Sequence, residues 1–182
     1  MAEAFSNKLT RAAGIVTTSS SGSIGVTTTI ITGISTVGVA VSDLVDNANF
    51  IAGTKVTGYG AAASQVVVDQ TSTNTATVTG SAIVNFLGMT TAYTSAAATK
   101  SILIGGTFAN NTTSSVNLTV EVHDASAGIQ AAIASKIPVP TGSSFVISDA
   151  GKSVLEAGDE VRVFCDTANA IDVNLSILTG VS

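Results

Sequence analysis

Two segments in the second half of the chain alternate apolar and polar residues without interruption. They are Val116–His123 and Ile171–Ile177, and in each the apolar positions recur at every second residue. Successive side chains of a β-strand point to opposite faces, so this period predicts strands with one buried and one solvated face. Such strands are typical of antiparallel sheets, because parallel sheets are usually covered on both faces. The two segments therefore predict an all-β fold built on antiparallel sheets.

The sequence between these two segments contains a piece that cannot lie in the middle of a sheet. Ile137–Gly142 includes two prolines, which lack the N–H groups that a central strand must donate, so this piece is predicted at a sheet edge or in a turn. Val154–Val163 predicts an extended piece, a turn at Ala157–Asp159 and then a strand. Ile129–Ser135 is compatible with one helical turn, although a strand is favoured there.

Residues 16–90 have a different pattern, in which short β-branched runs alternate with glycine-containing turns. This spacing is typical of a small sandwich or barrel. The predicted strands are Val26–Ile31, Val37–Val41, Gln65–Asp69 and Ala76–Thr79. Asp43–Asn47 is predicted to be a loop that leads into a strand at Ile51–Thr54, and Ser19–Ser23 is predicted to be a flexible connection.

The first fifteen residues leave two structures open. A short helix over Glu3–Ala13 that ends at Gly14 and a first β-strand are equally compatible with so short a segment. The early acidic residue and the absence of an apolar stretch argue against a secretory signal peptide. The chain also contains no run of eighteen or more apolar residues, so no transmembrane helix is expected.

Charge is scarce along the whole chain. Only 10% of the residues are charged, compared with about 25% in an average soluble chain, and the net charge is −5. The seven Lys and Arg residues are scattered, whereas nucleic-acid binding requires clustered positive charge, so neither nucleic acid nor membrane is expected as a partner. A surface rich in Thr, Ser and Ala is tolerable where an assembly buries much of it. The composition therefore favours a structural, homo-oligomeric role.

Side chains that carry chemistry are few. His123 is the single histidine; it lies on the polar side of a predicted strand, and no G-x-S-x-G elbow accompanies it, so we expect an exposed strand histidine. Cys165 is the single cysteine, which excludes an internal disulfide. It shares the parity of Val161 and Val163 and is expected to be a small buried hydrophobic residue rather than a reactive thiol.

Polar clusters in two turns and one glycine motif complete the candidates. One cluster contains Asp43, Asp46, Asn47 and Asn49, which lack EF-hand spacing; side chains that bond their own turn are favoured over a calcium loop. The other contains Glu156, Asp159 and Glu160 around one turn, whereas a glycosidase needs carboxylates from separate strands and aromatic sugar contacts. Gly58–Gly60 is not followed by the Lys-Ser/Thr of a phosphate loop. The sequence thus predicts no catalytic, cofactor-binding or metal-binding residue, no cofactor and no enzymatic activity.

Six segments carry a resemblance to a known family. They are Ser6–Leu9, Phe108–Thr112, Val116–Val122, Ile137–Ser144, Val154–Val163 and Ile171–Leu178. In them the chain resembles small β-rich virion proteins of tailed phages, particularly marine and cyanobacterial ones. Family members join a short N-terminal Asn-Lys-Leu piece almost directly to the later strands, whereas here residues 16–90 intervene. The resemblance implies that 1–15 and 91–182 form an antiparallel β-sandwich, and that 16–90 is an inserted small β-module similar to repeats of phage fibres and decoration proteins.

The resemblance implies an assembly module with no catalytic residues to carry over. A capsid decoration or cement protein is the leading expectation, and a neck, collar or tail component is second. A carbohydrate-binding or host-receptor-binding module and a small hydrolase are the alternatives; the absence of Trp and the presence of only two Tyr count against the former. Expected partners are further copies of the chain and other virion proteins (major capsid, neck or tail), in virions assembled in the host cytoplasm. The expected contact elements are the arm 1–14, free to extend, and the proline-bearing edge 137–142.

Overall fold

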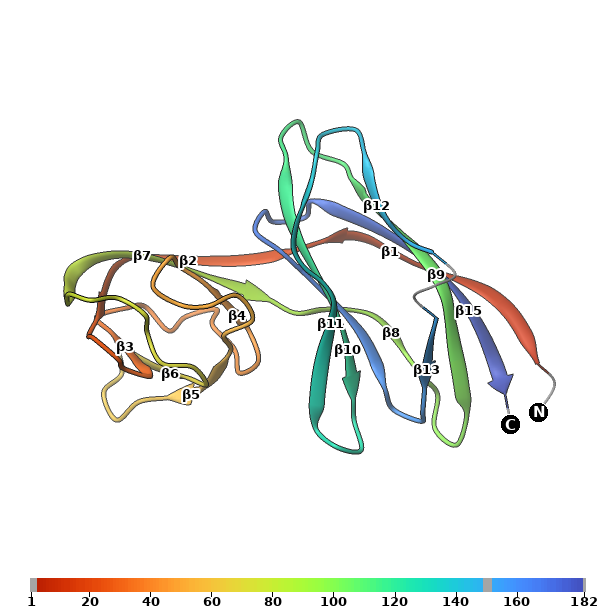
Figure 1. Ribbon diagram of the computed structural model, residues 1–182, viewed down its shortest axis with the longest axis horizontal. Helices are drawn as coiled ribbons and strands as arrows, with labels where there is room; N and C mark the ends of the chain where they lie inside the picture. Colours follow the sequence, from red (N-terminus) through yellow and green to blue (C-terminus); the bar gives the residue numbers. More distant parts are fainter. Residues whose placement is uncertain (1–2, 149–151, 182) are drawn as a thin grey trace. The chain divides into compact units, whose positions relative to one another are not determined.

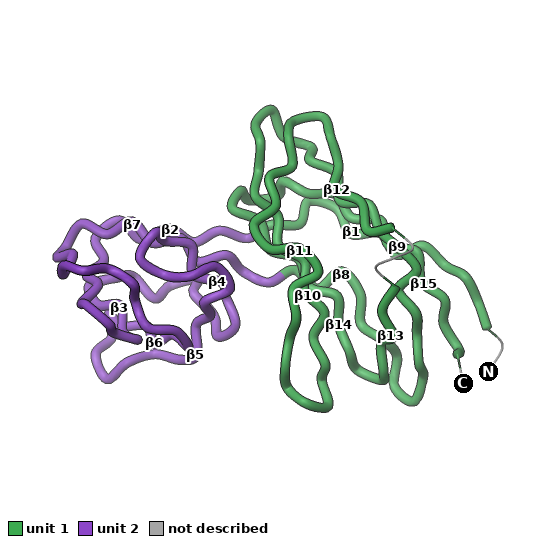
Figure 2. Tube along the Cα trace, viewed as in Figure 1, with its two compact units in different colours: residues 1–14, 90–182 green, residues 15–89 purple. Residues whose placement is uncertain are grey.

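The computed structural model describes residues 3–148 and 152–181, and every regular element within them is a β-strand (Figure 1). The strands fall into two compact units (Figure 2). Residues 1–14 and 90–182 form the sandwich unit, and residues 15–89 form the insert unit. The chain therefore leaves the sandwich unit after Gly14 and returns to it at Thr90. Within the described ranges, no helix is long and apolar enough to span a membrane.

The sandwich unit contains two antiparallel sheets. Sheet I has the strand order β1-β15-β9-β12, and β13 pairs with another part of β9. Its strands are β1 (Ala4–Ala13), β15 (Ile171–Val181), β9 (Lys100–Asn110), β12 (Ser144–Ile147) and β13 (Ser153–Leu155). Sheet II has the order β11-β10-β14-β8. Its strands are β11 (Ile129–Val139), β10 (Val116–Asp124), β14 (Glu160–Cys165) and β8 (Thr90–Thr94).

Sheets I and II share one hydrophobic core. Sheet I contributes Leu103, Phe108 and Leu175, and sheet II contributes Leu118, Val120 and Val163, all fully buried. Burying one large apolar side chain stabilises a fold by about 1.5–3 kcal/mol, so this shared core holds the two sheets together. The predicted all-β, antiparallel sandwich is confirmed, and the two alternating segments are its strands β10 and β15.

The segments that the sequence left open are strands. β1 takes up Ala4–Ala13 and β11 takes up Ile129–Val139, so neither place is helical. Pairing decides both, because β1 is in register with β15 and β11 with β10 over most of their lengths. The predicted edge position of the prolines is confirmed, since β11 is the outermost strand of sheet II and carries Pro138. The turn predicted at Ala157–Asp159 also lies between β13 and β14.

The insert unit forms one six-stranded sheet with the order β4-β7-β2-β3-β6-β5. Its strands are β2 (Ile15–Ile24), β3 (Ile30–Thr32), β4 (Leu44–Asp46), β5 (Val56–Tyr59), β6 (Gln65–Val68) and β7 (Val78–Gly88). The sheet encloses its own core, whose fully buried members include Ile24, Ile31, Val66, Val84 and Phe86. The core of the sandwich unit contains none of these residues, so each unit buries a separate set of apolar side chains.

Several strand predictions for the insert unit are wrong. Val37–Val41 and Ile51–Thr54 contain turns rather than strands, and Asp43–Asn47 is not a loop, because Leu44–Asp46 is β4. Positive φ angles at Gly38 (80°) and Gly53 (90°) interrupt the extended backbone. Leu44–Asp46 is extended because it pairs with β7, a contact that local sequence does not encode.

The boundaries of other insert strands also differ from the prediction. Only the end of Val26–Ile31 is extended, because Thr27 (φ 50°) lies in a turn, and β7 begins two residues into Ala76–Thr79. Ser19–Ser23 is not a flexible connection but part of β2. Its hydroxyls bond neighbouring backbone: Ser21 donates to the Gly33 carbonyl at 2.9 Å, and Ser23 accepts from the Gly80 N–H at 2.7 Å. Gln65–Asp69 is confirmed as β6, which ends at Val68.

Candidate functional site

His123 lies near the end of β10, where it is half-buried rather than exposed as expected. In the ladder it is opposite Gln130 on one side and Glu160 on the other. Its Nδ1 atom is buried and has no hydrogen-bond partner within residues 3–148 and 152–181. Among the described residues, no serine therefore bonds Nδ1 of this ring.

Cys165 is fully buried in the core of the sandwich unit, as predicted from its parity with the valines of β14. Burial raises the pKa of its thiol from 9.0 to about 11, because the apolar surroundings disfavour the thiolate. The thiolate is the reactive form of cysteine, so this thiol is inert at neutral pH.

The polar side chains of the Asp43–Asn49 segment bond the backbone of their own turns. Oδ2 of Asp43 accepts the N–H of Ala40 at 2.7 Å, and Oδ1 of Asn47 accepts the N–H of Asn49 at 2.8 Å. Burial raises the pKa of the Asp43 carboxyl, and the bond from Ala40 opposes that shift. Across the described residues, no three His, Cys, Asp or Glu side chains lie close enough to hold a metal ion. The segment stabilises its turns.

The three acids near the β13–β14 turn also have structural contacts. Asp159 is buried; its Oδ1 accepts the Ala125 N–H at 3.0 Å and its Oδ2 accepts the Glu156 N–H at 2.9 Å. Glu160 pairs with Arg162 at 2.7 Å, and Glu156 pairs with Lys100 at 3.1 Å on the exposed surface. Each of the three carboxylates thus has a partner within a few residues of the turn or on a neighbouring strand.

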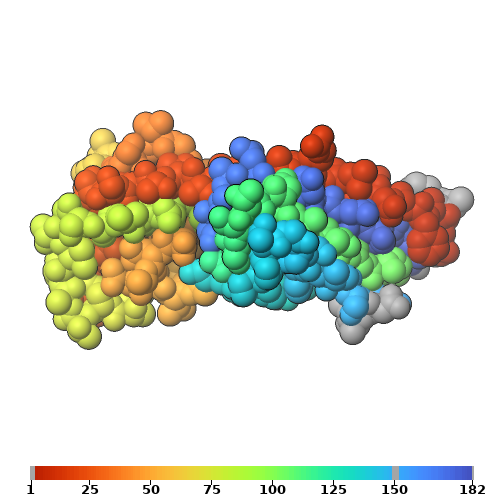
Figure 3. Space-filling model, turned by 90° about the horizontal axis from the view of Figure 1, so that it is seen from above, coloured from red at the N-terminus to blue at the C-terminus, as the bar shows by residue number. Residues whose placement is uncertain are grey.

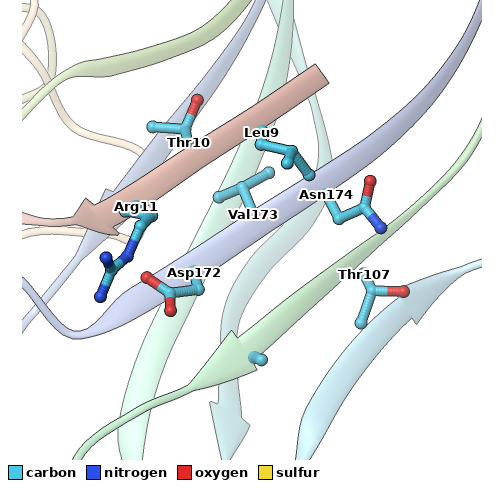
Figure 4. A pocket seen from close by; sticks show the side chains of 8 residues that line it. Leu9, Thr10, Arg11, Thr107, Asp172, Val173 and Asn174 are labelled. Atoms are coloured by element: carbon cyan, nitrogen blue, oxygen red, sulfur yellow. The ribbon is translucent and has the colours of Figure 1, made fainter. Parts of the chain in front are cut away.

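The outer face of sheet I carries a pocket of about 330 Å³. Figure 4 shows side chains from β1, β15 and β9 around it, among them Leu9, Arg11, Thr107 and Asn174. Asp172 is its single acid, and Oδ1 of this residue accepts the N–H of Ala12 at 2.8 Å, where β1 bulges. That carboxylate is therefore engaged in holding β1 to β15, in a pocket lined by both apolar and polar side chains.

A row of apolar side chains crosses the same face. Phe5 of β1 is opposite Leu178 of β15, Leu178 is opposite Ile102 of β9, and Ile102 is opposite Val154 of β13. Residues directly opposite on one face have Cβ atoms about 4.5–5.5 Å apart, so the four side chains form a continuous band. Phe5 is 76% exposed and Val154 is 61% exposed. We call these four residues the apolar row.

A second line of residues runs parallel to the apolar row. Leu9 is opposite Asn174, Asn174 is opposite Thr107, and Thr107 is opposite Val146. Its two ends are apolar and well exposed, at 72% for Leu9 and 57% for Val146. In the described part of the sandwich unit, four of the five large apolar side chains that are exposed belong to these two lines; the fifth is Ile129. Exposed apolar side chains in this unit are therefore concentrated on one sheet face.

The sequence analysis missed this face, although one local signal was present. Phe5, Asn7 and Leu9 share a face only if 4–13 is a strand, and that choice was open. The expected arm 1–14 is not free to extend, because its Ala4–Ala13 portion pairs with β15 along sheet I.

Comparisons with protein-family models, curated proteins and solved structures found no match to the chain.

Proposed function

We propose that the chain is a non-enzymatic structural protein of a tailed-phage virion, and that it decorates the capsid through subunit contacts. A neck, collar or tail position is the second assignment, and the number of copies per particle separates the two. The single observation that carries the proposal is the apolar row on the outer face of sheet I. The resemblance noted in the sequence supplies the virion setting.

The apolar row and the second line beside it support an assembly role, because their exposed ends are unfavourable in an isolated subunit. Phe5, Leu9, Val146 and Val154 expose more than half of their surfaces to water. Clustered exposure of this kind marks interaction sites, whereas exposed apolar residues on monomers are usually scattered. Each such side chain contributes about 1.5–3 kcal/mol when it becomes fully buried against a neighbour.

The remainder of the molecule supports the non-enzymatic part of the proposal. Asp43 and Asp159 accept backbone N–H groups, and Cys165 is enclosed in the core. Each of these three candidate side chains therefore has a structural task. The low overall charge also favours close packing of copies, because it limits repulsion between them.

Incorporation of surface variants into virions tests the proposal. Val154→Lys places a charge at the β13 end of the apolar row, and burial of an unpaired charge is strongly unfavourable. Ile129→Lys is the matched control, because Ile129 is 64% exposed at the start of β11 in sheet II. Each variant replaces the native protein during phage growth, and its amount per purified particle is measured by quantitative mass spectrometry.

We expect Val154→Lys to reduce incorporation at least about tenfold, which corresponds to about 1.4 kcal/mol of contact energy. Ile129→Lys should be incorporated like the native protein. Both variants must first show native circular dichroism and an unchanged urea midpoint, because both positions are exposed. Native levels of the folded Val154→Lys protein in particles would contradict the proposal.

A further inference from the structure

Strand β1 is an open sheet edge of unusual regularity. It is the terminal strand of sheet I, and in the described part of that sheet it pairs with β15 alone. Seven consecutive residues, Ala4–Thr10, keep an unbroken register with β15. Figure 3 shows β1, in red, at the surface along β15, in blue. An edge strand presents unpaired N–H and C=O groups, so such a strand is a template for pairing with another chain.

The other edges of the sandwich unit are less suited to pairing. β11 contains Pro138, register shifts on either side of Val120 in its partner strand, and a positive φ of 49° at Lys136. Bulges and prolines of this kind block edge-to-edge pairing. The strands β12, β13 and β8 span four, three and five residues. In the described residues, β1 is therefore the long edge that lacks both proline and an early bulge.

The sequence from Glu3, just before β1, to Arg11 is complementary to itself in one antiparallel register. Two copies of one strand can be paired antiparallel only about a two-fold axis through a residue, because paired residues must both direct their amides toward the partner or both away. An axis through Asn7 sets Phe5 opposite the partner subunit's Leu9. The same axis sets Glu3 opposite the partner subunit's Arg11. The apolar pair and the charged pair each occur twice across the axis.

Other axes lose these pairs. An axis through Lys8 sets two lysines directly opposite each other, which is destabilising. An axis through Ser6 sets Glu3 opposite the partner subunit's Leu9 and leaves Arg11 without an acid. Glu3, Phe5, Leu9 and Arg11 are all exposed, so each is available for a cross-strand contact. Charge complementarity and the apolar pair therefore select the axis through Asn7.

We propose that β1 pairs antiparallel with β1 of a second copy of this chain, about a two-fold axis through Asn7, so that the two sheets I become one continuous sheet. Phe5 and Leu9, the most exposed large apolar side chains in the described part of the sandwich unit, then cover each other. The apolar row of one copy continues into Leu9 of the partner subunit. This dimer is the building unit of the proposed assembly role, on which the inference rests, and two-fold symmetry closes it.

Charge reversal tests the pairing in solution. In the dimer, Arg11→Glu replaces two attractive pairs by two repulsive ones, and we expect dimerisation to weaken about tenfold, measured by sedimentation equilibrium. Glu3→Arg should weaken it similarly. The double variant E3R/R11E exchanges the two charges and should restore the native dissociation constant. A double variant as weak as either single variant would overturn the register.

Cysteine cross-linking locates the axis independently. Asn7→Cys places two thiols opposite each other on the axis, so mild oxidation should give a disulfide-linked dimer. Lys8→Cys is the matched control: it is exposed on the adjacent position and should remain uncross-linked. The native Cys165 does not interfere, because it is buried. Cross-linking of Lys8→Cys with none at Asn7→Cys would overturn the proposed axis.

Different results would contradict the virion assignment and the β1 pairing. Native protein that is monomeric at concentrations up to about 1 mM, yet incorporated into particles, would overturn the β1 pairing and leave the virion assignment in place. A dimer that responds to the variants as expected but is absent from particles would support the β1 pairing and overturn the virion assignment.

Discussion

At the scale of single residues, a buried carboxylate of the sandwich unit holds a turn in place. Asp159 is the clearest case, because both oxygens of one buried carboxylate accept backbone N–H groups, from Ala125 and from Glu156. The bond from Ala125 connects the β13–β14 turn with the β10–β11 hairpin, and the bond from Glu156 closes the turn itself. A carboxylate that accepts two N–H groups is held in place by both of them.

Removal of this carboxylate should destabilise the fold. Asp159→Ala leaves two N–H groups without their acceptor, and we expect the free energy of unfolding to fall by about 2–4 kcal/mol. Glu156→Ala, in the same turn, removes an exposed carboxylate that pairs with an exposed lysine, and its effect should stay within about 0.5 kcal/mol. Urea unfolding of both variants measures the difference; equal effects would contradict a structural role for Asp159.

Cys165 makes stability depend on alkaline pH. The pKa of its thiol is raised to about 11 in the folded protein from an ordinary value of 9.0, so the folded state favours the protonated form. This contribution is complete below pH 9 and is lost as pH rises toward 11, because the unfolded chain releases its thiol proton first. The loss is about 2–3 kcal/mol in total.

Comparison with a variant isolates this effect from other alkaline titrations. The difference in free energy of unfolding between the native protein and Cys165→Ala should shrink as pH is raised from 8.5 to 11. Urea unfolding at a series of pH values measures it. A difference that stays constant over this range would show that the thiol has the same pKa in both states.

At the scale of elements, the chain leaves β1 through a position where only glycine fits. Gly14 has a φ of 121°, and a Cβ atom at this position would lie 2.4 Å from the carbonyl oxygen of Thr167. The N–H of Asn169 and that of Ala170 bond the carbonyls of Gly14 and Ala13, so the end of β1 is fixed against this loop. Gly14 and the loop that contains Thr167 therefore cannot move apart without breaking those bonds.

Gly14→Ala should therefore destabilise the protein by more than backbone conformation alone explains. We expect a loss of about 3 kcal/mol or more in the free energy of unfolding. Gly128→Ala is the control, because Gly128 also has a positive φ, 67°, but open space around it, and its loss should be about 1 kcal/mol. Thermal and urea unfolding compare the two; similar losses would show that the contact with Thr167 is relieved.

Strands were predicted correctly where the alternation of apolar and polar residues was long. The prediction failed where pairing with distant strands determines whether a segment is extended. β10 and β15 carry an unbroken period of two, and the prolines of 137–142 marked an edge. β3 and β4 are only three residues each, and they are strands because β2, β6 and β7 pair with them. Segments this short carry too few residues for periodicity to separate a strand from a turn.

The candidate surface could not be predicted from the sequence. The apolar row joins Phe5, Ile102, Val154 and Leu178, which come from four strands and from both ends of the chain. Each is an ordinary strand residue when its own segment is considered alone. Only the register of sheet I places them on one line, and a single sequence does not specify the register of distant strands. The buried Cys165, by contrast, followed from parity within one strand.

At the scale of the whole molecule, the sequence of the sandwich unit is interrupted between Gly14 and Thr90, and these two residues are in contact. The N–H of Gly14 donates to the Oγ1 of Thr90 at 3.4 Å, so a very short connection can replace residues 15–89. The core of the sandwich unit uses no residue from that segment. Insertions into a surface connection are tolerated when the host keeps its own core.

A chain that lacks residues 15–89, with Gly14 joined to Thr90 through a short glycine linker, should therefore fold. We expect a far-ultraviolet circular dichroism spectrum typical of β-sheet, one cooperative unfolding transition, and the same dimerisation constant as the full chain. A chain that is unfolded or aggregated in native buffer would show that the sandwich unit depends on the insert unit.

The central claim is that the protein is built into virions, and its copy number in purified particles tests this most directly. Quantitative mass spectrometry against the major capsid protein gives that number. Capsid decoration predicts copies on the order of hundreds per particle, as the many equivalent sites of a capsid lattice require. A number on the order of ten would instead place the protein in a neck, collar or fibre ring. Absence from the particles would contradict the account.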